Sequence, residues 1–335
     1  MMLASLVFMI ISASFMSYLI APFFVKMAVK FNITDTVNER SAHTVATPRG
    51  GGLIFITVFG LCSIFNYFMP IFQVPHGFGI IIMLAFACAL LGFLDDRYSL
   101  PSWVRLLTQF ILVGYPSMHA PIIFEQVPVI LNYLLYALSW VWFINLFNFM
   151  DGTDGYAAQE TIFILIFIAI LSASLRPVAL ILCSAILGFF RVNYPKASIF
   201  MGDAGSYFLG YILFGFMFYM ATSSSSVIIA CVIISLLFSL DASYTLIKRM
   251  LKREAFFSAH RSHWYQRLYN LGYSHAYIFW LAVVLNSVLL FFALLSYYAQ
   301  YALMYLVFAL LWLASIAYSI RRKELHKTLQ MKEQI

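Results

Sequence analysis

Apolar runs of about 20 residues recur along the whole chain, and each is long enough to cross a bilayer as a helix. The alternating ten-residue segments of a membrane β-barrel are absent. We therefore predict an all-α, polytopic integral membrane protein with about eleven transmembrane helices. The expected spans are residues 3–29, 51–69, 77–94, 103–118, 128–147, 158–175, 177–190, 204–221, 225–246, 276–297 and 300–320.

The composition agrees with a membrane protein. The 335 residues are 63% hydrophobic and only 10% charged, whereas a soluble domain of this size needs more polar residues to cover its surface. The first apolar segment, from Met1 to Val29, has no basic region before it and is too long for a signal-peptide core, so we expect a retained helix. The four cysteines lie in apolar runs without zinc-ligand spacing.

The positive charges predict the orientation. All but one of the 20 lysines and arginines lie in one alternating set of loops, and Arg176 is the exception. The positive-inside rule makes this set cytoplasmic, with the N-terminus in the periplasm and the C-terminus in the cytoplasm. This orientation explains the net charge of +7 without a nucleic-acid partner. We expect one domain over residues 1–320 and a basic cytoplasmic tail over 321–335. The candidate active-site loops are 26–50, 95–105, 145–157, 191–203 and 247–275.

An aspartate pair lies where the third span meets the cytoplasm. Asp95 and Asp96 are adjacent, so their carboxylates repel unless a cation lies between them. Magnesium is often held by one or two carboxylates together with substrate phosphates. The plainer alternative is an interfacial ion pair with Arg97. Arg105 enters the next span, where a cation needs a partner such as an anionic ligand.

A second polar group ends the fifth span. Asn145, Asn148 and Asp151 follow a three-residue spacing, which can place them on one face of a helix end. Asp154 and two glycines follow in "NFMDGTDGYA". Amides, carboxylates and exposed backbone suit a metal–phosphate or polar-base site, and a turn of simple interfacial residues is the alternative.

Three further segments add charge on the same face. Arg49 stands before three glycines, where backbone can approach an anion. Lys196 precedes Asp203, a third carboxylate that suits a magnesium–diphosphate site or, alternatively, caps a helix. The last segment, "AHRSHWYQRLYNLG", carries a cationic cluster that could stabilise a diphosphate or form a basic membrane-surface patch. Its cations are His260, Arg261, His263 and Arg267.

The segments "LGFLDDR", "NLFNFMDGTDGYA", "FMGDAGSYFLGY" and "HRSHWYQRL" occur in that order, and they resemble the polyprenyl-phosphate N-acetylhexosamine-1-phosphate transferases of glycosyltransferase family 4. The resemblance covers about residues 1–320 and is nearest to the O-antigen-initiating branch. The muramoyl-pentapeptide branch has three consecutive histidines in its last motif and a lysine where Ser99 stands here.

The resemblance implies transfer of a sugar 1-phosphate, GlcNAc or a related 6-deoxy sugar, from a UDP-N-acetylhexosamine to undecaprenyl phosphate. The products are undecaprenyl-diphospho-sugar and UMP, in the first membrane step of lipopolysaccharide O-antigen or other cell-wall polysaccharide synthesis. It implies Mg²⁺, with Mn²⁺ as a substitute, an active site on the cytoplasmic face of the inner membrane, and a homodimer as an open question. Phospho-N-acetylmuramoyl-pentapeptide transfer and, from another class, membrane transport are the alternatives.

The resemblance also implies roles for single residues. The implied catalytic residues are Asp95, Asp96 and Asp151, with one of the first two acting as a base toward the lipid phosphate. The implied metal ligands are Asn148 and Asp203, with Asp95 and Asp96 close by. The implied substrate-binding residues are Arg49, Arg105, Asn145, Asp154, Lys196, His260, Arg261 and His263.

Overall fold

The computed structural model describes residues 2–31, 34–35, 47–120, 122, 126–221, 224–254 and 261–333. Within these residues the chain is almost entirely helical, which confirms the all-α expectation. The helices are α1 (Met2–Lys30), α2 (Gly52–Phe68), α3 (Phe78–Tyr98), α4 (Ser102–Met118), α5 (Val129–Met150), α6 (Tyr156–Leu171), α7 (Arg176–Asn193), α8 (Gly202–Ala221), α9 (Ser225–Ile234), α10 (Leu236–Leu251), α11 (Trp264–Asn270), α12 (His275–Tyr298) and α13 (Ala302–Glu333). Two short strands, β1 (Thr34–Asp35) and β2 (Thr47–Pro48), pair antiparallel.

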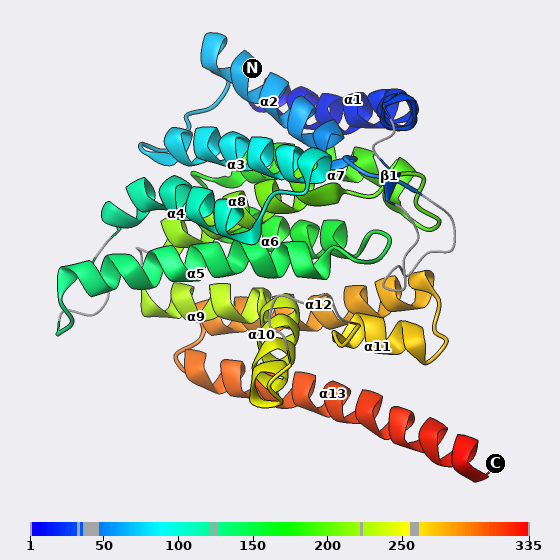
Figure 1. Cartoon of the computed structure of the whole chain (residues 1–335). Helices are drawn as coiled ribbons and strands as arrows, with labels where there is room; N and C mark the ends of the chain where they lie inside the picture. The colour runs from blue at the N-terminus through cyan, green and yellow to red at the C-terminus, as the bar shows by residue number, and fades with distance from the viewer. Residues whose placement is uncertain are drawn as a thin grey trace.

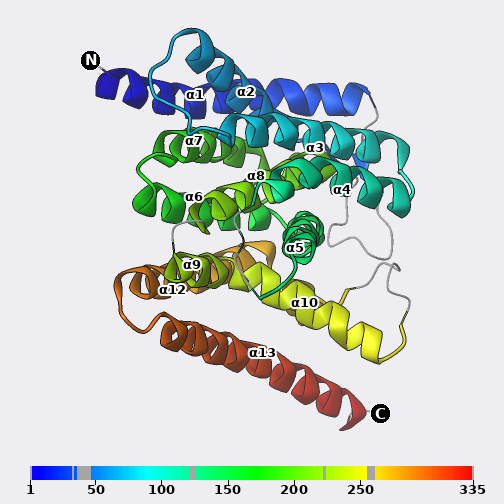
Figure 2. The ribbon, with the colours of Figure 1, turned by 90° about the vertical axis from the view of Figure 1, so that its left-hand side faces the viewer.

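The long helices run side by side in a bundle that extends from α1 and α2 at one edge to α13 at the other (Figures 1 and 2). Helix α8 lies in the middle, between α3 and α5 (Figure 1). Of its most apolar window, 78% is buried inside the protein, compared with 17% for α1 and for α13. Because α8 packs against both α3 and α5, the polar ends of these helices, which are distant along the chain, can lie close together. The candidate site is at these ends.

Each of the eleven expected spans contains a helix, but the helices differ in length. Seven described helices are long and apolar enough to cross a membrane, or eight if α9 and α10 form one broken span. Helices α2 and α6 are shorter, with 17 and 16 residues. The chain is therefore a multi-pass helical membrane protein.

The expected ninth span, residues 225–246, is broken in the structure. Helices α9 and α10 meet at Ser235 with a bend of 72°. The hydroxyl of Ser235 donates to the carbonyls of Cys231 and Val232, which satisfies backbone acceptors where the helix stops. Beyond the bend, α10 carries a buried aspartate, Asp241, and ends in two basic residues. Residues 225–246 contain no proline or glycine that would mark this bend in the sequence.

Most of the expected basic tail is helical in the structure. Residues 321–333 continue the last helix, α13, well beyond its apolar part, as the red end of the chain in Figure 1 illustrates. Helix α13 therefore reaches α11 on the same side of the bundle as the C-terminal end of α5.

Candidate active site

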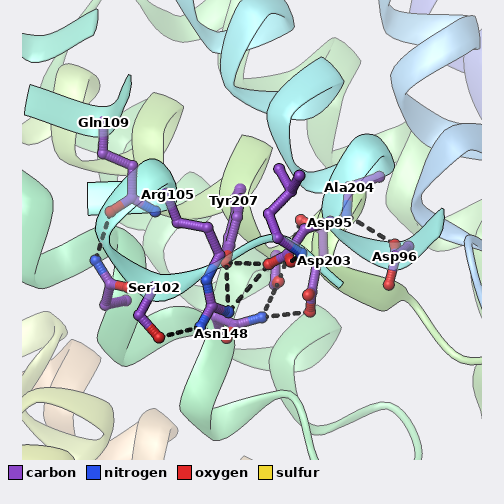
Figure 3. Close-up of polar contacts among 12 residues, drawn as sticks. Asp95, Asp96, Ser102, Arg105, Gln109, Asn148, Asp203, Ala204 and Tyr207 are labelled. Carbon is purple, nitrogen blue, oxygen red and sulfur yellow. Dashed lines mark hydrogen bonds and ion pairs between the residues drawn. The ribbon is translucent and has the colours of Figure 1, made fainter. Parts of the chain in front are cut away.

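The C-terminal end of α3 supplies two adjacent carboxylates that face different partners. Asp95 is buried and accepts three hydrogen bonds, from the backbone of Leu100 at 2.9 Å, from Nη1 of Arg105 at 3.0 Å and from the hydroxyl of Tyr207 at 2.9 Å (Figure 3). Since successive residues of a helix point about 100° apart, Asp96 faces elsewhere. Asp95 thus joins α3, α4 and α8, and its charge is already compensated by Arg105.

Asp96 points at the start of α8 (Figure 3). Its Oδ2 accepts the backbone N–H of Ala204 at 3.2 Å, while its Oδ1 is buried and has no hydrogen-bond partner among the residues that the structure describes. A buried carboxylate oxygen that lacks a partner is costly in free energy. Such an oxygen is therefore a candidate to take a proton or to face a bound cation.

Asn148, near the end of α5, reaches the first turn of α8. Its Nδ2 donates to Oδ1 of Asp203 at 2.7 Å and to the hydroxyl of Ser206 at 3.0 Å (Figure 3). The two residues expected to be metal ligands are thus in direct contact, although 55 positions separate them. The carboxylate of Asp203 therefore holds a side chain of the neighbouring helix.

Asp151 follows the last residue of α5 and adds a third carboxyl to this end of α8. Burial, followed by the negative charges of Asp203 and Asp96, raises the pKa of the Asp151 carboxyl well above its ordinary value. The positive charge of Arg49 and the backbone N–H of Gly202 act in the opposite direction. The carboxyls of Asp96, Asp151 and Asp203 therefore lie close enough to interact electrostatically, and Arg49 partly offsets their negative charge.

This set of groups fits a cation only in part. Among the described residues, no three acidic, histidine or cysteine side chains form a complete metal site. Magnesium often takes one or two protein carboxylates and fills its shell with water and substrate phosphates. Asp203 and the amide oxygen of Asn148 suit that arrangement, although the amide now directs its nitrogen at Asp203 and would have to turn.

Two of the expected substrate-binding residues are engaged elsewhere. Asn145 donates to the side chain of Gln109 at 2.6 Å and to the carbonyl of Val141 at 2.7 Å, so its amide joins α5 to α4. Oδ2 of Asp154 accepts the backbone N–H of Ala197 at 3.1 Å, and this contact fastens the loop between α7 and α8. The neighbouring Lys196 is exposed on that loop.

Arg105, expected to bind an anionic ligand, lies beside the carboxylates. Its guanidinium donates to Asp95, and its Nη2 donates to the hydroxyl of Ser102 at 2.9 Å (Figure 3). These bonds fix the direction of the guanidinium. Arg105 is therefore a cation at the edge of the acidic cluster whose orientation is set by Asp95 and Ser102.

The cationic motif near residue 260 forms a second group. His260 lies outside the described residues, whereas Arg261 and His263 lie just before α11. His263 is buried, and its Nδ1 lies 3.6 Å from Oδ1 of Asp241. Arg267 is bound to Glu324 of α13, at 2.8 Å and 2.6 Å, and so faces the C-terminal helix.

The second group reaches the carboxylate cluster through α11. The hydroxyl of Tyr265 donates to the carbonyl of Phe149 at 3.2 Å, two residues before Asp151. Burial and then the charges of Asp241 and Asp151 raise the pKa of Tyr265 above its usual range. The segment that begins at Arg261 thus lies against the loop that follows α5.

Reasoning from the sequence missed several residues of this site. Tyr207, Ser206 and Gln109 are uncharged and lie in apolar runs, so no local signal marks them. Asp241 had a usable signal, because an ionisable residue inside a predicted span is uncommon and usually has a partner or a function.

Comparison with known proteins gives the family of the chain. The family described as Glycosyl transferase family 4 matches residues 78–222, which include both aspartates of α3, Asn148 and Asp203. The chain is 30% identical over 275 residues to the probable undecaprenyl-phosphate N-acetylglucosaminyl 1-phosphate transferase of Bacillus subtilis strain 168, covering 77% of this chain and 75% of that protein.

More distant relatives are named for related reactions. A decaprenyl-phosphate N-acetylglucosaminephosphotransferase of Mycolicibacterium smegmatis is 24% identical, over 79% of this chain and 75% of the relative. A phospho-N-acetylmuramoyl-pentapeptide-transferase of Staphylococcus epidermidis is 27% identical, over 60% of this chain and 72% of the relative. With its multi-pass helical fold and its acidic cluster, the chain belongs to the polyprenyl-phosphate hexosamine-1-phosphate transferase family and is an enzyme of that kind.

Proposed function

We propose that the protein transfers N-acetylhexosamine 1-phosphate, GlcNAc or a related 6-deoxy sugar, from a UDP-sugar to undecaprenyl phosphate. The observation that carries this proposal is the cluster of Asp96, Asp151 and Asp203 at one end of membrane helices, with Arg49 and Arg105 beside it. Carboxylates and arginines together suit a reaction between two phosphates. The relatives named for GlcNAc transfer support the sugar class.

The reaction exchanges one phosphorus–oxygen bond for another. A phosphate oxygen of the lipid bonds to the β-phosphorus of the donor, the bond from that phosphorus to the UMP oxygen breaks, and UMP leaves with the electron pair. Asp96 is the better base of its pair, because its Oδ1 has no hydrogen-bond partner in the described part of the chain, while Asp95 accepts three hydrogen bonds. Asp96 would take the proton of a singly charged lipid phosphate.

Asn148 and Asp203 would hold Mg²⁺, with Asp151 close by. The ion would neutralise charge on the donor diphosphate during transfer. Arg105, aligned by Asp95 and Ser102, would hold a phosphate. The contact between Asn148 and Asp203, and the alignment of Arg105 by its two partners, support these roles.

An apolar cavity between α5, α8 and α9 offers a place for the lipid chain. Its volume is about 390 Å³, and Trp142, Phe143, Leu146, Phe214 and Phe218 are among its lining residues. The lining residue nearest the C-terminal end of α5 is Leu146, one helical turn before Met150, so the cavity extends along α5 toward the end that carries the acidic cluster. A polyprenyl chain lying there would keep its phosphate near the acidic cluster.

The orientation belongs to the same proposal. Eleven crossings, with α9 and α10 together forming one, would place the N-terminus in the periplasm and the C-terminus in the cytoplasm of an inner-membrane protein. Almost all positive charges would then lie on the cytoplasmic side. Nucleotide sugars would reach the acidic cluster from that side, as a step of O-antigen or other envelope polysaccharide synthesis would require.

The test is an assay of purified, detergent-solubilised protein with undecaprenyl phosphate and a panel of UDP-sugars. The panel includes UDP-GlcNAc, UDP-GalNAc, UDP-linked 6-deoxy N-acetylhexosamines and UDP-N-acetylmuramoyl-pentapeptide. We expect UMP release and a lipid product with the mass of a diphospho-N-acetylhexosamine, both dependent on the lipid and abolished by EDTA. Turnover of the pentapeptide donor alone would favour the muramoyl branch, and no UMP release with any donor would contradict the proposal.

The ion has a separate test within the same assay. Asp203→Asn keeps the shape of the side chain but removes a charge, so we expect a higher Mg²⁺ concentration at half-maximal rate. A magnesium titration identical to that of the wild-type protein would remove Asp203 from the ion site.

A further inference from the structure

We propose that Asp241 and Glu324 are positioning residues that hold the segment from Arg261 to Asn270, the α11 arm, against the active site. This inference rests on the proposed function. The arm carries Arg261 and His263, and its apolar side chains Trp264, Tyr265 and Leu268 are buried in the bundle. Two carboxylates, one on α10 and one on α13, make the principal attachments.

The attachment to α10 is a fully buried carboxylate. Both oxygens of Asp241 accept the backbone N–H of Trp264, at 3.0 Å and 2.9 Å, and Oδ1 also accepts the hydroxyl of Thr245 at 3.2 Å. The ring of His263 lies beside the same carboxylate, 3.6 Å away. A buried charge is tolerated only where such partners compensate it. Asp241 therefore fixes both the backbone and the ring at the start of α11.

The attachment to α13 is a bidentate ion pair. Nε and Nη2 of Arg267 donate to the two carboxylate oxygens of Glu324, at 2.8 Å and 2.6 Å. This planar two-point contact sets the orientation of the guanidinium as well as its distance. Lys327 adds a bond from its Nζ to the carbonyl of Asn270 at 3.1 Å. The helical extension of α13 thus provides a second attachment for the arm.

Between these two attachments, the arm contacts the loop after α5. The hydroxyl of Tyr265 donates to the carbonyl of Phe149, and its ring is stacked 6.0 Å from the ring of His263. Gly152 lies directly under this hydroxyl, since a Cβ atom there would overlap it. The position of His263 relative to Asp151 is therefore set by a chain of contacts that begins at Asp241 and Glu324.

The role differs from substrate binding. Arg267 lies one helical turn after His263 and is bound to Glu324. Arg267 therefore affects the reaction through the position of the arm. Loss of the ion pair between Arg267 and Glu324, the brace, should weaken binding of the UDP-sugar, because the arm would no longer hold its side chains in place. The lipid site on α5, α8 and α9 should be unchanged. The expected signature is a higher KM for the UDP-sugar with an unchanged KM for undecaprenyl phosphate.

A charge exchange tests the brace. Arg267→Glu and Glu324→Arg should each raise the KM for the UDP-sugar about tenfold, the effect of losing about 1.4 kcal/mol of binding. The double variant R267E/E324R should recover most of that loss, because the pair is restored with its charges reversed. Arg322→Glu is the control, since it makes the same charge change as Arg267→Glu at an exposed site two residues before Glu324. It should leave both KM values unchanged.

Hydrogen exchange over residues 261–270 reads the position of the arm without turnover. Each single variant should exchange faster there than the wild-type protein, and the double variant should return toward it. Asp241→Asn, which keeps the shape of the side chain, should show the same local increase. Unchanged exchange and kinetics in well-folded single variants, or a double variant no better than the singles, would overturn the proposal.

The outcomes separate this inference from the proposed function. If the wild-type protein releases no UMP but the single variants still show faster exchange in the arm, the proposed reaction is wrong and the proposed role of the brace stands. A single variant that fails to fold is replaced by Glu324→Gln, which keeps one acceptor for Arg267. For that variant a smaller rise in local exchange is expected, and no rise would count against the brace.

Discussion

At the residue scale, the two aspartates of α3 differ in their partners. Within the described ranges, the carboxylate of Asp95 accepts three hydrogen bonds, whereas that of Asp96 accepts one, at Oδ2, and none at Oδ1. Asp96→Asn should therefore lower kcat by roughly 10²–10⁴-fold as a lost base, with an unchanged or higher unfolding temperature. Asp95→Asn should lower the free energy of unfolding by about 1–3 kcal/mol. UMP release and thermal unfolding in detergent measure the two effects, and an equal loss of stability in both variants would contradict the assignment.

The raised pKa of Asp151 predicts a pH-dependent stability. Burial and then the charges of Asp203 and Asp96 make the folded state bind this proton more tightly than the unfolded state. Stability from this group is therefore greatest below the unfolded pKa of about 3.9 and is lost as the pH rises from there through the folded pKa. In chelator, Asp151→Asn should raise the unfolding temperature at alkaline pH and by much less at about pH 4. An equal gain at both pH values would exclude the charge as its cause.

At the element scale, the approach of α3 to α8 brings the acidic groups together. Gly92 makes it possible, because a Cβ atom there would overlap backbone atoms of Asp203 and Ala204. Gly92→Ala should push Asp96 away from α8, lower the free energy of unfolding by about 1–3 kcal/mol and reduce turnover. Gly79→Ala in the same helix, where a Cβ would meet nothing within 4 Å, should leave both unchanged or slightly improved. Similar losses in the two variants would exclude close packing as the reason.

At the scale of the whole molecule, the charge distribution predicts the orientation in the membrane. The four native cysteines are buried, so single introduced cysteines report cleanly. Ser224→Cys, exposed at the start of α9, should react in intact cells with a thiol reagent that cannot cross the membrane. His326→Cys, exposed on α13, should react only after the cells are permeabilised. The reverse pattern would place the acidic cluster outside, away from cytoplasmic nucleotide sugars.

The sequence by itself determined the class of the protein and the composition of its site. Apolar runs of about 20 residues specify membrane helices because that length matches the bilayer, whatever the neighbours are. The carboxylates and amides next to these runs were identifiable because charged residues make up only 10% of the chain. Asn148 and Asp203, which the resemblance implies as metal ligands, are in contact in the structure.

Only the tertiary structure decided what each of these residues touches. Asp95 and Asp96 are equivalent in the sequence, and they differ because α4 and the side of α8 face one, while the start of α8 faces the other. The bend at Ser235 and the pairing of Arg267 with Glu324 were equally hidden. Each depends on which helices are adjacent, and adjacency is set by side-chain packing between segments that are distant along the chain.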